Sequence, residues 1–152
     1  LHTIISILLS TYTNFHITSI GNIHTLNVEV YGEDIEVREG QKFLNWGILY
    51  PGTLTNYTFN VTSRSNIRAK LIIKAINWTF YNSQNQIVKQ TNETDSMILI
   101  SKYNETLMDP KQTIQVILTL KVIYSDEFID FLIENDIQTF SFDIRIYLTE
   151  KT

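Results

Sequence analysis

A chain of 152 residues with 43% hydrophobic and 12% aromatic side chains has enough apolar material for one packed core, which excludes a disordered chain. Its net charge of −4 is small, and it has no block of Lys and Arg, which argues against nucleic acid or a membrane surface as a partner. The absence of cysteine removes disulfides, thiolate metal sites and cysteine nucleophiles.

The first seventeen residues, LHTIISILLSTYTNFHI, are apolar from the first position onwards. They do not fit a secretory signal, because the first basic residue is Arg38 and no small-residue cleavage site follows the apolar stretch. The dense apolar part ends near residue 9, whereas a membrane-spanning helix needs about 20 residues. We therefore expect a chain without a membrane span, from which any signal peptide has already been removed.

Read as a strand, this stretch is longer than one small domain uses. Seventeen extended residues reach about 56 Å, against about 17–20 Å for an ordinary strand, and the odd positions form the more apolar face. An apolar strand at a chain end aggregates unless a groove receives it. The alternative is an ordinary first strand of the protein's own core.

We predict that residues 1 to about 12 fill a gap in a neighbouring copy of the same chain. In this prediction, residues 1–20 form a donor strand and linker, and residues 21–152 form the sandwich domain. Such a contact joins two different surfaces, so it repeats without closing and builds a filament of identical subunits. The predicted intersubunit residues are Leu1, Thr3, Ile4, Ile5, Ile7, Leu8 and Leu9.

Alternation of apolar and polar residues with period two dominates the rest of the chain. In chain order it appears in TLNVEV, IEVREG, IRAKLIIKAI, SMILIS, TIQVILTLKV and TFSFDIRIYLT. The last of these is the clearest, and its expected inward side chains are Phe140, Phe142, Ile144, Ile146 and Leu148. About seven such strands, separated by Gly, Pro and Asn turns, predict an all-β fold, an immunoglobulin-like antiparallel β-sandwich with Trp46 and Trp78 in its core or at its rim.

Five acceptor triplets for N-glycosylation follow the pattern Asn-X-Thr, at Asn56, Asn60, Asn77, Asn92 and Asn104. In TNYTFNVT, strand alternation places the Asn and Thr residues on one face and Tyr57, Phe59 and Val61 on the other. The sugar sites thus fall on the water side of the strand. We expect N-linked glycans and therefore an extracellular location.

One short helix is expected near residues 126–134. Ser125 is a suitable N-cap, Asp126 and Glu127 suit the positive first turn, and the apolar side comprises Phe128, Ile129, Phe131 and Leu132. Three carboxylates share one face of this helix and could hold a cation, but a solvated face is the favoured interpretation; they are Asp126, Asp130 and Glu134.

Residues for catalysis are scarce. The sequence has no nucleophile elbow, zinc-protease helix, phosphate-binding loop or dinucleotide fingerprint. The three histidines His2, His16 and His24 are spaced in a way that fits no single helical or hairpin metal site. We expect neither an enzyme nor a metal or cofactor site, N-linked glycans excepted.

The overall plan resembles the archaeal thread pilins. The resemblance is carried by the free LHTIISILL terminus, a strand and turn in WGILYPG at 46–52, the glycosylation sites in NYTFNVT, INWTF at 76–80 and the closing FSFDIRI. It implies a cell-surface filament subunit with an immunoglobulin-like fold, assembled head to tail by its N-terminal strand. It further implies N-glycans and a role in adhesion, cell–cell contact or biofilm formation.

Two other functions stay open. Trp46, Trp78 and the tyrosines could form a sugar-stacking platform, as in a secreted carbohydrate-binding β-sandwich module, although packing inside the sandwich is the favoured role. Such a module would stay monomeric and functional without residues 1–12, whereas a donor-strand subunit would lose assembly. A TasA-like biofilm-matrix fibre protein would form the same polymer, and the sequence does not separate it from a thread subunit.

Overall fold

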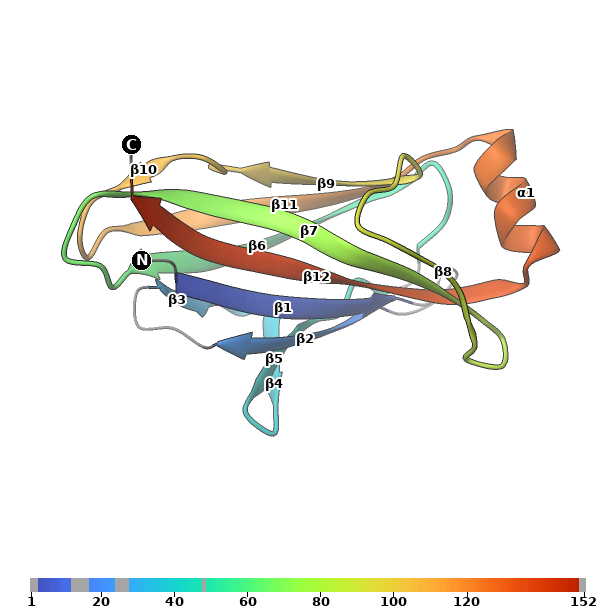
Figure 1. Cartoon of the computed structure of the whole chain (residues 1–152), viewed down its shortest axis with the longest axis horizontal. Helices are drawn as coiled ribbons and strands as arrows, with labels where there is room; N and C mark the ends of the chain where they lie inside the picture. The colour runs from blue at the N-terminus through green and yellow to red at the C-terminus, as the bar shows by residue number, and fades with distance from the viewer. Residues whose placement is uncertain (1–2, 12–16, 24–27, 48, 151–152) are drawn as a thin grey trace.

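A computed structural model describes residues 3–11, 17–23, 28–47 and 49–150, and for the first two ranges it describes the backbone. The described chain forms twelve strands and one helix (Figure 1). They are β1 (Thr3–Thr11), β2 (Ile17–Ile23), β3 (Val28–Tyr31), β4 (Ile35–Arg38), β5 (Gln41–Leu44), β6 (Leu54–Ser63), β7 (Ala69–Asn82), β8 (Ile87–Thr91), β9 (Met97–Lys102), β10 (Leu107–Met108), β11 (Thr113–Val122), α1 (Asp126–Glu134) and β12 (Ile137–Glu150).

The strands form two antiparallel sheets that pack as a sandwich, which confirms the predicted all-β class. The larger sheet has the order β10-β7-β12-β1-β2-β5-β4, and β8 pairs with the last part of β7, whose first two residues pair with β10. The smaller sheet has the order β3-β6-β11-β9. The immunoglobulin-like topology within this class stays a prediction. The described chain has more strands than the seven expected, because β2, β5, β8 and β10, which were not predicted, are short or lack regular alternation.

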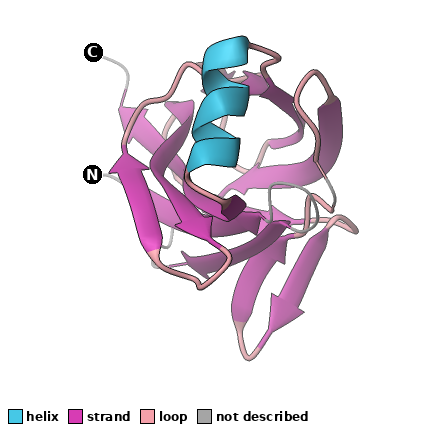
Figure 2. Cartoon of the chain, turned by 90° about the vertical axis from the view of Figure 1, so that its right-hand side faces the viewer, coloured by secondary structure: helices cyan, strands magenta, loops and turns pink. Residues whose placement is uncertain are grey.

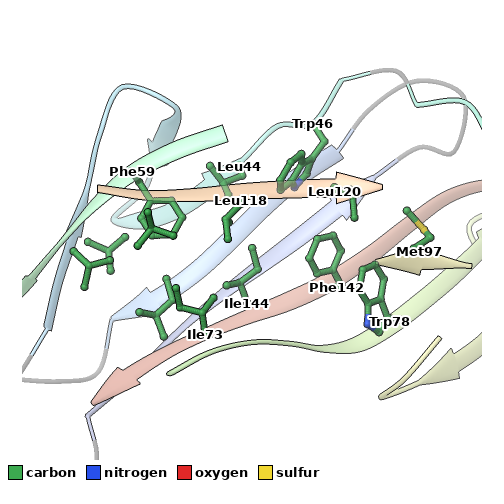
Figure 3. Packing of buried hydrophobic residues seen from close by; sticks show 14 of the residues in the cluster. Leu44, Trp46, Phe59, Ile73, Trp78, Met97, Leu118, Leu120, Phe142 and Ile144 are labelled. Atoms are coloured by element: carbon green, nitrogen blue, oxygen red, sulfur yellow. The ribbon is translucent and has the colours of Figure 1, made fainter. Parts of the chain in front are cut away.

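The inner faces of the two sheets form one apolar core, as the period-two pattern predicts. Figure 3 shows side chains from β5, β7 and β12 meeting those of β6 and β11. Trp46 and Trp78 are 2% and 4% exposed, so both are core residues. The predicted inward row of β12 is buried at every position: Phe140, Phe142, Ile144, Ile146 and Leu148.

Helix α1 lies across one end of the sandwich, which we call the helix pole (Figures 1 and 2). Its predicted cap is confirmed, because the backbone N–H of Phe128 donates to Ser125 Oγ at 3.1 Å. Phe128 is buried, and the Phe131 ring lies 5.5 Å from the Phe80 ring in an edge-on arrangement. The other end, where β12 finishes and β3 begins, is the terminal pole.

The expected strand in WGILYPG is wrong. Strand β5 ends at Leu44, and none of the described residues from 45 to 52 belongs to a strand. Gly47 adopts φ +72°, and its N–H donates to Asn45 Oδ1 at 3.0 Å, so the backbone turns here. The apolar side chains of this segment, Trp46 and Leu49, are buried without any strand.

Candidate assembly site: the slot beside β12

Strand β1 lies in the interior of the larger sheet, between β12 and β2 and antiparallel to both (Figure 1). Nine register pairs join it to β12, from Thr3 opposite Leu148 to Thr11 opposite Phe140. We call this position the β12 slot. The structure places β1 in the slot of its own chain, and the donation of this strand to another copy stays a prediction.

The register agrees with the apolar pattern of the opening stretch. Each odd-numbered residue of β1 stands opposite a buried residue of β12, and each even-numbered residue stands opposite a residue of its other face. Leu1 lies outside the described residues. The other predicted intersubunit residues all lie in β1: Thr3, Ile4, Ile5, Ile7, Leu8 and Leu9.

The β1–β2 hairpin is attached to the rest of the sheet mainly along one edge. Seven register pairs join β1 to β2, but β2 joins β5 through the single pair Gly21 and Lys42. The predicted boundary between residues 20 and 21 falls inside β2. The sequence did not reveal β2, because its apolar residues Ile17, Ile20 and Ile23 are three apart and so fall on both faces of a strand instead of on one.

The strand on the far side of the hairpin has its own anchors. Phe43 and Leu44 of β5 are buried, and the Lys42 ammonium donates to the backbone carbonyl of Val30 in the smaller sheet. Burial lowers the pKa of Lys42, since the charged form loses hydration. Strand β5 therefore keeps its place through contacts that do not involve β2.

A polar pair marks the outer face of β12 beside the slot. Asn77 interrupts β7 with φ +57°, at a register shift where β7 passes residues 141–143 of β12. Its Nδ2 donates to Asp143 Oδ2 at 2.6 Å, and Asp143 stands opposite Leu8 of β1. Asp143 Oδ1 is buried without a hydrogen-bond partner, and burial raises the pKa of this carboxyl.

Four of the five predicted glycosylation sites are exposed, and Asn60 is half-buried. In three of them the side-chain oxygen accepts a hydrogen bond: Asn56 from the Thr119 hydroxyl at 2.5 Å, Asn92 from the Asn77 N–H at 3.2 Å, and Asn104 from the Ile73 N–H at 2.8 Å. An N-glycan attaches to the side-chain nitrogen, so these three bonds survive attachment. At Asn77 the nitrogen itself is engaged, by Asp143.

The fold adds no support for the other candidate sites. Both indoles are buried and offer no face for stacking a sugar. The carboxylates of α1 are exposed, and the described part of the chain contains no group of three or more His, Cys, Asp or Glu able to hold a metal ion. All three histidines lie outside the described residues. No helix in the described ranges has the length and apolar content needed to cross a membrane.

No protein-family model, curated protein or solved structure matches this chain. Its function must therefore be inferred from its own residues and their arrangement.

Proposed function

We propose that this chain is a structural subunit of an extracellular filament, in which β1 of one copy occupies the β12 slot of the next. Copies of the chain would then form a head-to-tail homopolymer at the cell surface, serving adhesion, cell–cell contact or biofilm formation. The observation that carries this proposal is the position of β1. It is the first strand of the described chain, yet it lies in the interior of the larger sheet, where it pairs with β12 on one side and with β2 on the other.

A strand in this position is needed by whichever copy holds the slot. Without it, β12 would present an unpaired row of backbone N–H and C=O groups next to its buried apolar row. A second copy's β1 can make the same nine register pairs as the chain's own β1. Exchange between copies therefore conserves the contacts inside the slot, which makes it a low-cost route to assembly.

The glycosylation sites support an extracellular setting. Asn56, Asn77, Asn92 and Asn104 are exposed, as attachment of a glycan requires. None of the four lies on β1, β2 or β12, and of the four only Asn77 is hydrogen-bonded, within the described residues, to a wall of the slot, at Asp143.

The test uses the absence of native cysteine. Ser6 stands opposite Arg145, so cysteines at these two positions, placed on separate chains, are held within disulfide distance when β1 of one copy enters the slot of another. We expect an S6C chain and an R145C chain, unfolded and refolded together, to give a disulfide-linked pair. We expect the S6C/R145C double variant to give a ladder of covalent multimers on a non-reducing gel.

The matched control is S6C with Q86C, because Gln86 is an exposed turn residue between β7 and β8 and has no register partner in β1. It measures disulfides that form by random collision. If S6C/R145C yields only internally bridged monomers and negative-stain electron microscopy of the unmodified chain shows no threads, the proposal is wrong.

A further inference from the structure

The register fixes where a donated strand enters and leaves the slot. Thr3 stands opposite Leu148 at the terminal pole, and Thr11 stands opposite Phe140 near the start of β12, at the helix pole. A second copy's β1 in the same register therefore leaves the sandwich at the helix pole. The chain that follows β1 must therefore run from this pole to the body of the donating copy.

The next two strands begin at opposite poles. Strand β2 runs back from the helix pole, because Ile17 stands opposite Thr11. Strand β3 begins at the terminal pole, where Val28 stands opposite Ser63, the last residue of β6. The five residues between β1 and β2 reach at most about 20 Å, and the sixteen residues between β1 and β3 reach about 55 Å.

Three openings of this chain allow exchange, and each fixes how two copies meet. If β1 alone moves to the other copy, β2 stays in its own sheet and the copies meet helix pole to helix pole. If β1 and β2 move together as a hairpin, the copies meet terminal pole to terminal pole. Both contacts join like surfaces and close as dimers. Only if β2 is released, so that 12–27 becomes a connector, does the helix pole of one copy meet the terminal pole of the next.

Charge disfavours the contact between two helix poles. Residues 126–136 carry five carboxylates and no Lys or Arg, so this segment alone is more negative than the whole chain at −4. All five are exposed, and none forms an ion pair within the described residues. At the terminal pole, by contrast, charges of both signs are present: Arg64 pairs with Glu29, Arg68 pairs with Asp109, and Lys111 is exposed. Two helix poles therefore repel each other, whereas a helix pole facing a terminal pole avoids this repulsion.

Strand β2 is suited to release. It has one register pair with β5, it contains Gly21 in its interior, and its apolar residues do not alternate. Its neighbour β5 is held by the buried Phe43 and Leu44 and by the bond from Lys42 to Val30. The sandwich can therefore lose β2 while it receives a foreign β1 in the β12 slot.

From this geometry we infer that β2 leaves its own sheet when the filament forms. The chain from 12 to 27 then connects successive copies, and the acidic helix pole of the acceptor faces the terminal pole of the donor. The inference rests on the proposed function and adds the partner surfaces and the conformational step. Strand β2 is thus a strand in the single subunit and a connector in the polymer.

A disulfide between β1 and β2 tests the release. Ser6 stands opposite Asn22, so S6C/N22C, oxidised while dilute, fastens the hairpin. We expect the oxidised variant to form no threads in negative stain and the reduced variant to form them. The control disulfide, K102C/I117C, joins register partners in the smaller sheet, in the middle of β11, and should leave assembly unchanged. Threads of normal yield from fully oxidised S6C/N22C would overturn the inference.

Single cysteines at the two poles test the orientation. Asn135 is exposed beside α1, and Asn66 is exposed in the turn between β6 and β7. With a short bis-maleimide linker, we expect N135C chains to couple to N66C chains and not to each other. N135C–N135C or N66C–N66C coupling, with the S6C–R145C disulfide still forming between copies, would overturn the inference and leave strand exchange intact. Loss of that disulfide would instead overturn the proposed function.

Discussion

Truncation of Phe142 tests the packing behind the β12 slot. This ring is fully buried, and its centroid lies 4.1 Å from that of Trp78 with the planes at 17°, and 6.5 Å from that of Trp46. Phe142→Ala leaves a cavity between the sheets and should lower the free energy of unfolding by about 3–5 kcal/mol. Phe142→Leu keeps most of the volume but loses the ring stacking, so its cost should be about 1–2 kcal/mol.

The assay is urea unfolding followed by tryptophan fluorescence, because both indoles are buried next to this ring. The slope of the free energy against urea should stay unchanged if only stability has changed. Val37→Ala is the control, since Val37 is 62% exposed and its truncation should cost less than about 0.5 kcal/mol. A Phe142→Ala cost below about 1 kcal/mol at unchanged slope would refute the described packing. If this variant has no folded baseline, the difference between Phe142→Leu and Val37→Ala carries the test.

Two further predictions concern the pair of Asn77 and Asp143. Burial raises the pKa of Asp143 in the folded chain, so the folded state binds its proton more tightly than the unfolded state does. The free energy of unfolding therefore falls as the pH rises from the ordinary pKa of an Asp carboxyl to the raised pKa of the folded chain. Asp143→Asn should therefore increase the free energy of unfolding at pH 7, and urea titrations should show this advantage shrinking as the pH approaches 4; a constant advantage would contradict it. Because Asp143 engages the nitrogen of Asn77, glycopeptide mass spectrometry should find lower glycan occupancy at Asn77 than at Asn92, and Asp143→Ala should narrow the difference; equal occupancy in the unmodified chain would contradict this.

The parts of the fold that the sequence predicted are those in which one local pattern decides the structure. In strand β12, apolar residues recur at every second position from Phe140 to Leu148, and these five inward residues are all buried. Helix α1 begins where Ser125 can cap it and buries Phe128. In both cases side-chain periodicity and backbone hydrogen bonding favour the same conformation, so no tertiary contact overrides the local preference.

The parts that it missed depend on partners distant in the chain. Strand β2 forms because its backbone pairs with that of β1, whereas its own sequence lacks alternation. The Trp46 segment reads as a strand, but Gly47 turns it and the indole is buried all the same. By its sequence position Asn77 is an ordinary strand residue, yet a register shift places its side-chain amide against Asp143, which is 66 residues away. Sequence patterns do not contain such pairings.

The balance between a closed subunit and a polymer follows from the slot. Because the closed and exchanged forms share the β1–β12 contacts, their difference lies in the connector and in the surfaces that meet. A tethered strand has an effective concentration of the order of millimolar. At about 1 μM protein, the closed form is therefore lower in free energy than the exchanged form by roughly 4 kcal/mol. New contacts at each junction must exceed this difference and the cost of releasing β2.

The helix pole has the apolar surface to supply part of that energy. Tyr124 is 69% exposed, Ile133 is 73% exposed and Tyr50 is 54% exposed, all at the end where a donated strand leaves the slot. Burial of a few such side chains contributes about 1.5–3 kcal/mol each, which is comparable to the free-energy advantage of the closed form. Filament formation is therefore decided at the poles, where exchange creates new contacts, and the slot supplies the continuity of the chain of subunits.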